Sequence, residues 1–229
     1  MSDDCIRALR ERGIDALVLD GKSHQIVRTP ELPALASRVD AALRVTLRPD
    51  GQLLAFQAQE RWNGWFASNF RSLLNIEGKR REEFGKILSY RYPGSKLVSV
   101  SFRDLDSLSE SAGVEYALEV PGRVRREEGT LRINMIWPSA MARSLAQETT
   151  RHYDLVLWSL WAGESSFSLV LPPGSTVKTV PAPLALDNDL LTYELRCTPS
   201  GTSVACQRRL IFKRREIPKE RYPEWRELC

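Results

Sequence analysis

Short runs with apolar residues at alternate positions recur along most of this chain, and prolines and glycines separate them. In the clearest case, strands predicted over 42–48 and 52–60 flank a turn at 49–51. Apolar side chains occupy every second position of the first strand, so one of its faces is predicted to be buried. A chain built largely from such segments is restricted to β-rich architectures.

A change of period marks a helical insertion in the front half. Aromatic residues and leucines recur at helical spacing from about 64 to 76, and a second helix is predicted from 80 to about 90. A short helix is also expected over 3–12. The other strand-like runs of the front half are at 16–19, 96–103, 113–120 and 130–136. We therefore expect 1–136 to form an antiparallel sheet domain with a helical insertion at about 64–90.

The rear half predicts a second domain over 139–229. Proline-rich breaks at 172–174 and 181–183 separate several short strands, which is typical of a β-sandwich, and 218–228 should close the chain as a short helix. The predicted strands are at 152–161, 166–171, 175–180, 190–197 and 204–214. The expected fold class is α+β and β-rich, with an antiparallel sheet carrying a helical insertion followed by a β-sandwich-like domain.

The net charge of +4 and pI near 9.0 raise the question of nucleic-acid binding. The basic residues at 79–81 and 123–126 are each followed at once by two glutamates, so their charge is compensated locally. A denser cluster between 208 and 215 is interrupted by apolar residues, as in a strand with one solvated face. No aromatic platform accompanies the charge, so no nucleic-acid partner is predicted.

Apolar residues make up 42% of the chain and charged residues 27%, a balance typical of a globular protein with a core. No run of about 18 apolar residues occurs. The first five residues form neither a basic start nor an apolar signal core. We expect no membrane insertion.

Catalysis needs a nucleophile with a base, or a metal, and the sequence offers few candidates. The two histidines, His24 and His152, each stand beside a strand signal, where a structural role is the simpler interpretation. The four cysteines contain no CxxC pair, so no metal site is predicted. Glu82 and Glu83 are chain neighbours that point to different faces, and Gly21-Lys22-Ser23 lacks the upstream glycine of a phosphate-binding loop. We therefore expect no enzyme activity and no cofactor.

The cysteines do support one specific prediction. If 201–202 is the two-residue turn of a hairpin, Cys197 faces Cys206 in a non-hydrogen-bonded pair, where side chains approach most closely. We predict a Cys197–Cys206 disulfide and, with it, an oxidising compartment. The alternative is two reduced cysteines packed in the core. Cys5 and Cys229 are either free or paired with each other.

Six tryptophans raise the alternative of glycan binding, because flat aromatic rings stack on sugar faces. Trp158 and Trp161 are the candidate binding surface. A core role is the favoured interpretation, since Trp62 and Trp65 recur with phenylalanines at core spacing. Trp225 is expected to pin the C-terminal helix to the strands.

Short motifs also follow one another in an order shared with a known family. In the front half they are Ala16-Leu17-Val18, Thr29-Pro30, Arg48-Pro49-Asp50-Gly51, and Gly64 with Ala67 and Arg71. In the rear half they are Arg151-His152-Tyr153-Asp154-Leu155, Leu171-Pro172-Pro173-Gly174, Arg209-Leu210, Ile217-Pro218 and Tyr222-Pro223-Glu224-Trp225-Arg226. Across nearly its whole length the chain resembles the C-terminal region of bacterial transglutaminase-like proteins with flanking domains of unknown function, of the DUF3857/DUF3858 type.

The resemblance implies that the family's Cys-His-Asp catalytic core lies upstream of Met1, because no residue of this chain matches that triad. It also implies export to the bacterial cell envelope, in the periplasm, where a disulfide persists. Gly64 and Arg71 match as family features. On physical grounds Gly64 would begin a helix, and Arg71 would reach toward a carboxylate.

The expected function is a non-catalytic accessory region of a transglutaminase-like envelope protein, serving docking, substrate presentation or structural support. Its partner would be another protein or the missing core. One alternative is a stand-alone module that binds glycan or protein, and another is a basic nucleic-acid-binding protein.

Overall fold

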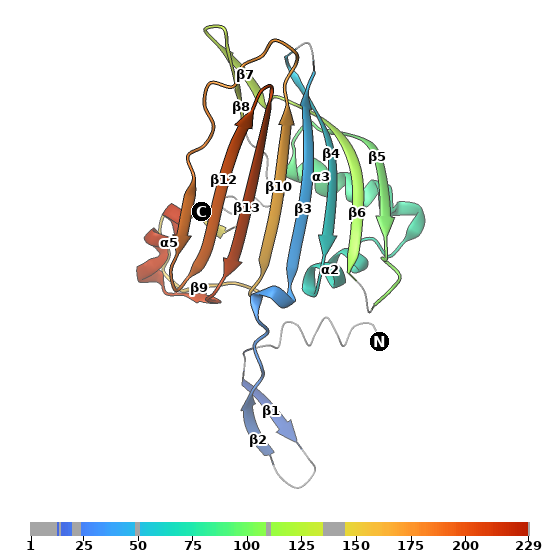
Figure 1. Ribbon diagram of the computed structural model, residues 1–229. Coiled ribbons are helices and arrows are strands. Elements are labelled where there is room, and N and C mark those ends of the chain that lie inside the picture. The colour runs from blue at the N-terminus through green and yellow to red at the C-terminus, as the bar shows by residue number, and fades with distance from the viewer. Residues whose placement is uncertain are drawn as a thin grey trace.

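The computed structural model describes Gly13 and residues 15–19, 24–48, 51–108, 111–134 and 145–228. Its main feature is a single eight-stranded sheet (Figure 1). In spatial order the strands are β11 (Leu184–Asp187), β12 (Leu191–Ser200), β13 (Ser203–Phe212), β10 (Ala162–Val170), β3 (Arg38–Leu47), β4 (Leu53–Trp62), β6 (Ala112–Pro121) and β5 (Lys96–Arg103). Neighbouring strands are antiparallel except β10 and β3, which run parallel.

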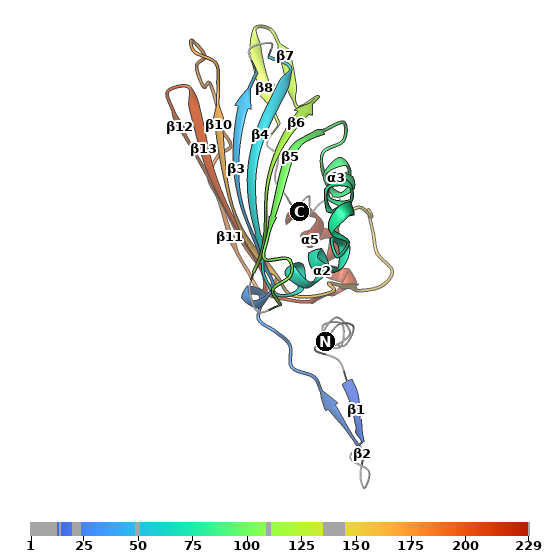
Figure 2. The ribbon, with the colours of Figure 1, turned by 90° about the vertical axis from the view of Figure 1, so that its right-hand side faces the viewer.

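In the described part of the chain, the helices lie on one face of this sheet (Figure 2). Among the described residues, the α-helices are α2 (Trp65–Leu73), α3 (Arg80–Arg91) and α5 (Tyr222–Leu228). Single 3-10 turns are η1 (Ala34–Ala36), η2 (Glu77–Lys79) and η3 (Lys219–Arg221). We call the other side, on which no described helix lies, the open face. An antiparallel sheet can present such a face to water because its strands alternate buried and polar side chains.

The core lies between the sheet and the helices. Strand β3 shows how the sequence produces it, because Leu43, Val45 and Leu47 are at most 3% exposed whereas the alternate residues Ala42 and Arg44 face solvent. A larger buried cluster packs the strands against α2 and α3, and a smaller one surrounds the fully buried Trp225 of α5. The periodicity of each strand therefore decides which of its side chains lie on the open face.

Three small two-stranded sheets accompany the main sheet in the ranges that the structure describes. They pair β1 (Asp15–Leu19) with β2 (His24–Arg28), β7 (Val124–Glu127) with β8 (Thr130–Ile133), and β9 (Leu155–Val156) with β14 (Glu216–Ile217). The β1–β2 hairpin projects away from the main sheet (Figure 1). Most of its side chains are exposed.

The predicted β-rich α+β class is confirmed, and so are most of the local elements. The hairpin predicted around 49–51 corresponds to β3 and β4, and the helical insertion to α2 and α3. Among the rear strands, those predicted over 190–197 and 204–214 correspond to β12 and β13. These elements carry their own periodicity and turn signals, so local sequence was enough to find them.

The rear strands do not build the predicted β-sandwich. Instead β10 pairs with β3, so strands from both sides of the predicted boundary at 136–139 share one sheet. Residues 175–180 form no strand, and between 152 and 161 only Leu155–Val156 does. Val177 and Val180 still pack against the core from an irregular segment, which explains their strand-like apolar pattern.

Several predictions lie outside the described residues. They are the helix over 3–12, the states of Cys5 and Cys229, the end of the strand-like run at 130–136 and most of the 49–51 turn. Within the described ranges, no helix is long and apolar enough to cross a membrane.

Candidate functional site

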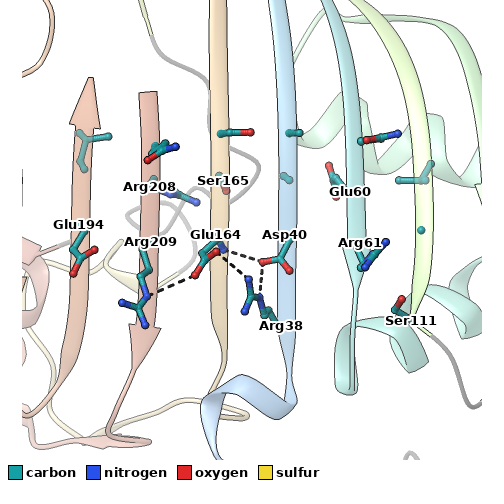
Figure 3. A pocket seen from close by; sticks show the side chains of 18 of the residues that line it. Arg38, Asp40, Glu60, Arg61, Ser111, Glu164, Ser165, Glu194, Arg208 and Arg209 are labelled. Carbon is teal, nitrogen blue, oxygen red and sulfur yellow. Dashed lines mark hydrogen bonds and ion pairs between the residues drawn. The ribbon is translucent and has the colours of Figure 1, made fainter. Parts of the chain in front are cut away.

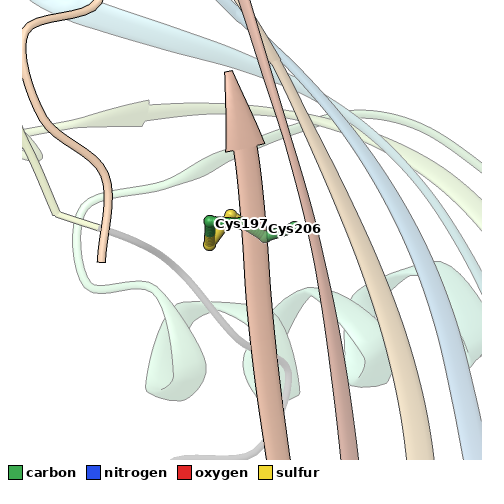
Figure 4. Close-up of a disulfide and its surroundings, with 2 residues drawn as sticks. All are labelled: Cys197 and Cys206. Atoms are coloured by element: carbon green, nitrogen blue, oxygen red, sulfur yellow. A yellow bond between two sulfur atoms is a disulfide. The ribbon is translucent and has the colours of Figure 1, made fainter. Parts of the chain in front are cut away.

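Cys197 and Cys206 form a disulfide between β12 and β13, with an Sγ–Sγ distance of 2.04 Å (Figure 4). The predicted register is present, since Cys197 is paired with Cys206 and Ser200 with Ser203. Both cysteines face the helix-covered core, with exposed fractions of 8% and 2%. The disulfide therefore stabilises the strand pair from inside and presents no reactive sulfur on the surface.

We expect this disulfide to be present in every molecule of protein purified without reductant. In a Cys5→Ser, Cys229→Ser background, a thiol count under denaturing, non-reducing conditions should give none, whereas two thiols would contradict the bond.

Replacing Cys197 and Cys206 by alanine should lower the free energy of unfolding by about 2–3 kcal/mol, because the bridge closes a loop of roughly ten residues. Urea unfolding of the wild type and of the double alanine variant measures the difference in the free energy of unfolding.

Of the possible binding surface formed by Trp158 and Trp161, the structure buries Trp161, in line with the favoured core role. Trp161 is only 9% exposed and packs edge-on against Phe66 and Phe212, with ring centroids 5.7 and 4.7 Å away. Trp158 is 40% exposed and lies 3.7 Å, centroid to centroid, from Trp65. The alternating pattern around Trp161 reflects core packing, so Trp158 alone remains a candidate for surface binding.

The two histidines lie in separate places. His24 belongs to the projecting β2 strand, and His152 is exposed in the irregular segment before β9. Among the described residues, no group of three or more His, Cys, Asp or Glu side chains is placed to hold a metal ion.

The open face contains a hollow of about 1090 Å³ (Figure 3). Its lining extends from Leu184 and Ala185 at one edge of the sheet to Arg103 at the other. Because neighbouring strands lie about 4.8 Å apart, eight strands span about 34 Å. None of the described residues that line the hollow is aromatic. Most of the residues that line it are polar or charged, and they are spread across the whole width of the sheet.

One row of mostly charged side chains crosses the hollow at the same level on all eight strands. From β11 to β5 the register places Ala185, Glu194, Arg209, Glu164, Asp40, Arg61, Gly113 and Arg103 beside one another. Figure 3 shows the central members side by side.

A salt-bridge network holds the middle of this charged row. Arg38 contacts Asp40 through Nε at 2.6 Å and Glu164 through Nη2 at 3.0 Å, and Arg209 lies 3.7 Å from Glu164 (Figure 3). The hydrogen bond to Asp40 raises the pKa of Arg38. These contacts join β13, β10 and β3, and so reinforce the parallel junction at which the two parts of the chain meet.

The next row along the strands is largely uncharged. It contains Arg196, Gln207, Ser166, Ala42, Gln59 and Glu115 in register. We call its four middle residues the floor, namely Gln207, Ser166, Ala42 and Gln59. Small side chains at two of these positions leave room for a ligand, and the two amides can both donate and accept hydrogen bonds.

A buried network lies on the opposite side of the same strands. The Glu60 carboxylate accepts hydrogen bonds from Tyr116 Oη at 2.7 Å and from Trp62 Nε1 at 3.0 Å, and it pairs with Arg91 Nη1 at 2.6 Å. Burial raises the pKa of Tyr92 to about 12 and raises the pKa of Tyr116 as well. The network ties α3 to β4 and β6 beneath the hollow.

Gly64 and Arg71, the two residues that the resemblance singled out, have structural roles. Gly64 is the N-cap of α2, as predicted, and has a positive φ of 56°. The described contacts of Arg71 are made to backbone carbonyls. It donates from Nε to the Leu105 carbonyl at 3.2 Å and from Nη2 to the Asp104 carbonyl at 3.1 Å. Arg71 therefore anchors the loop after β5, because guanidinium groups also satisfy backbone carbonyls.

Residues 130–229 match the family described as a Domain of Unknown Function with solved-structure structure (DUF3858). The DUF3858 part of the predicted resemblance is thereby supported for these residues. No curated protein matches the chain, and no solved structure does. The DUF3858 region supplies Arg196, Gln207 and Ser166 to the hollow, whereas Ala42 and Gln59 come from the preceding part.

Sequence reasoning missed the hollow. The alternation within β3, β4, β10 and β13 is visible in the sequence, and it identifies the outward side chains of each strand. Their arrangement into rows depends on the pairing of β10 with β3, whose paired residues are more than 120 positions apart in the sequence. No turn connects those two strands, so no local signal reveals their register.

Proposed function

We propose that this chain is a non-catalytic interaction region that docks a polypeptide in the hollow on its open face. In this proposal it is an accessory part of a transglutaminase-like protein of the bacterial cell envelope, where it serves docking, substrate presentation or support of the catalytic core. The order of its family motifs and the DUF3858 match support the association. The Cys197–Cys206 disulfide supports an oxidising compartment such as the periplasm.

The hollow is the observation that carries the proposal. It crosses every strand of the main sheet and takes its lining from both halves of the chain. Its floor offers amide and hydroxyl groups to a polypeptide backbone, while the charged row offers contacts of both signs to side chains. A surface of this shape suits an extended chain better than a small molecule, which is normally enclosed on several sides.

A glycan-binding module is the second candidate, and Trp158 is the residue that favours it because of its 40% exposure. Trp65 packs against this ring, which reduces the area left for a sugar. The hollow itself favours a polypeptide over a glycan, since its described lining contains no aromatic ring.

Photo-crosslinking in the cell that makes the protein tests the proposal. A benzophenone amino acid would replace Gln59 or Gln207 on the floor, and matched probes would replace Tyr90 of α3 and Tyr153, which are 72% and 84% exposed. We expect irradiation to attach a distinct protein to the floor positions and not to the control positions. Mass spectrometry of the adduct then identifies the partner.

Two outcomes contradict the proposal. Floor probes that yield no protein adduct, or no more than the control probes, would rule out docking at this face. Acyl-transfer or peptidase activity of the chain alone, abolished by replacing one cysteine, would contradict the non-catalytic role.

A further inference from the structure

The charges around the hollow are not fully compensated within the molecule. Three arginines on outward strand positions, Arg44, Arg61 and Arg196, form no side-chain hydrogen bond or ion pair with any described residue. The remaining arginines of the open face are paired. Arg38 contacts Asp40 and Glu164, Arg48 contacts Glu119, Arg103 contacts Glu115 and Arg209 contacts Glu164.

The register places the three unpaired arginines around the floor. Arg196 lies in the floor row itself, beside Gln207. Arg61 lies in the charged row, two residues beyond Gln59 on β4, and Arg44 lies on the other side, two residues beyond Ala42 on β3. Arg61 and Arg196 line the hollow, and Arg44 lies just beyond its lining, so arginine positions flank the floor on three sides.

We propose that the polypeptide ligand of the hollow is an acidic segment, whose carboxylates bind Arg44, Arg61 and Arg196. This inference rests on the docking function proposed above and adds the chemistry of the partner. The planar guanidinium group suits a carboxylate because it donates two parallel hydrogen bonds to the two oxygens. An extended segment of about ten residues would span the 34 Å width of the sheet at roughly 3.3 Å per residue.

The acidic residues of the hollow favour a polypeptide over a nucleic acid. Asp40, Glu164, Glu194 and Glu115 line the same surface as the arginines. A phosphodiester chain carries a charge at every nucleotide and would meet these carboxylates along its whole path. A polypeptide can place carboxylates at the three arginines and uncharged or basic residues elsewhere.

Fluorescence anisotropy with the full chain tests the inference. The probe is a fluorescein-labelled decapeptide of alternating glutamate and glycine, and the comparison probes are the lysine–glycine decapeptide and a ten-nucleotide oligothymidylate. The test variant is Arg44→Gln with Arg61→Gln and Arg196→Gln. The matched control is Arg125→Gln with Lys219→Gln and Arg226→Gln, which removes the same charge from exposed residues of β7, η3 and α5.

We expect the glutamate probe to bind at low salt and the test variant to weaken its binding about tenfold, the cumulative effect of three exposed ion pairs. The control variant should change binding by less than about twofold. Unchanged circular dichroism and melting temperature of the test variant would exclude misfolding as the cause.

Other results would overturn the inference. Equal losses in the test and control variants would show a general charge effect, and comparable binding of the lysine probe would show that the sign of the charge is irrelevant. Tighter binding of oligothymidylate, lost in the test variant, would assign the arginines to nucleic acid. If floor crosslinks form but the glutamate probe does not bind, the inference of an acidic partner is wrong, whereas the proposed docking function is supported. If neither crosslinking nor probe binding occurs, the docking function and the acidic partner are both wrong.

Discussion

Replacing Glu60 by alanine is expected to destabilise the protein by about 3–5 kcal/mol, the range typical of breaking a buried ion pair from one side. The Glu60 side chain is fully buried, and its partner Arg91 lies 2.6 Å away with a side chain only 17% exposed. Without the carboxylate, a nearly buried guanidinium and the Tyr116 hydroxyl both lose their acceptor. Equilibrium urea unfolding monitored by tryptophan fluorescence measures the loss.

The double variant Glu60→Leu with Arg91→Leu is the control for this prediction. It removes both charges at once, so its destabilisation should be smaller than that of Glu60→Ala, since replacing a whole buried pair by apolar residues is often close to neutral. If the double variant is as unstable as Glu60→Ala, the loss of side-chain packing, and not the uncompensated charge of Arg91, determines the loss of stability.

Replacing Gly64 by alanine is expected to destabilise the protein by about 3 kcal/mol or more, which combines an unfavourable backbone conformation with a steric clash. Gly64 has a φ of 56° and a ψ of −127°, a backbone conformation that residues other than glycine rarely adopt. A Cβ at this position would lie 2.0 Å from the carbonyl oxygen of Ala36. Either α2 or η1 must therefore move, and thermal unfolding should show a clearly lower melting temperature.

Gly78 provides a matched control in η2. It has no atom within 4 Å of the position of a Cβ and does not have a positive φ. Gly78→Ala should therefore be neutral or slightly stabilising, because alanine restricts the unfolded chain more than glycine does. Equal stability of Gly64→Ala and the wild type would show that the contact between η1 and the start of α2 is not required.

Local sequence was sufficient for elements whose signals are contained within about ten to twenty residues. The two-residue turn at 201–202 determined the register of β12 and β13, and this register places Cys197 opposite Cys206. The glycine before α2 and the helical spacing of Phe66, Phe70 and Leu74 likewise indicated where the insertion begins. In each case a covalently short connection limits the possible partners.

Periodicity alone was less reliable in the rear half. The apolar pattern at 175–180 resembled a strand, yet Val177 and Val180 reach the core from an irregular segment. Sequence left a binding surface at Trp161 open as the alternative to the favoured core role, and Phe66 and Phe212 cover its ring. Burial imposes an alternating pattern on any extended chain that runs along a core, whether or not it forms a β-ladder.

The sequence by itself determined the β-rich class, the helical insertion and the strand pair that carries Cys197 and Cys206. Only the tertiary structure decided that β10 joins β3, which makes one sheet from two predicted domains and brings Arg44, Arg61 and Arg196 around one floor. The physical reason is that side-chain alternation specifies which face a residue occupies but not which strand lies beside it. That choice depends on backbone hydrogen bonds between distant segments, and any two strand edges of suitable length can form them.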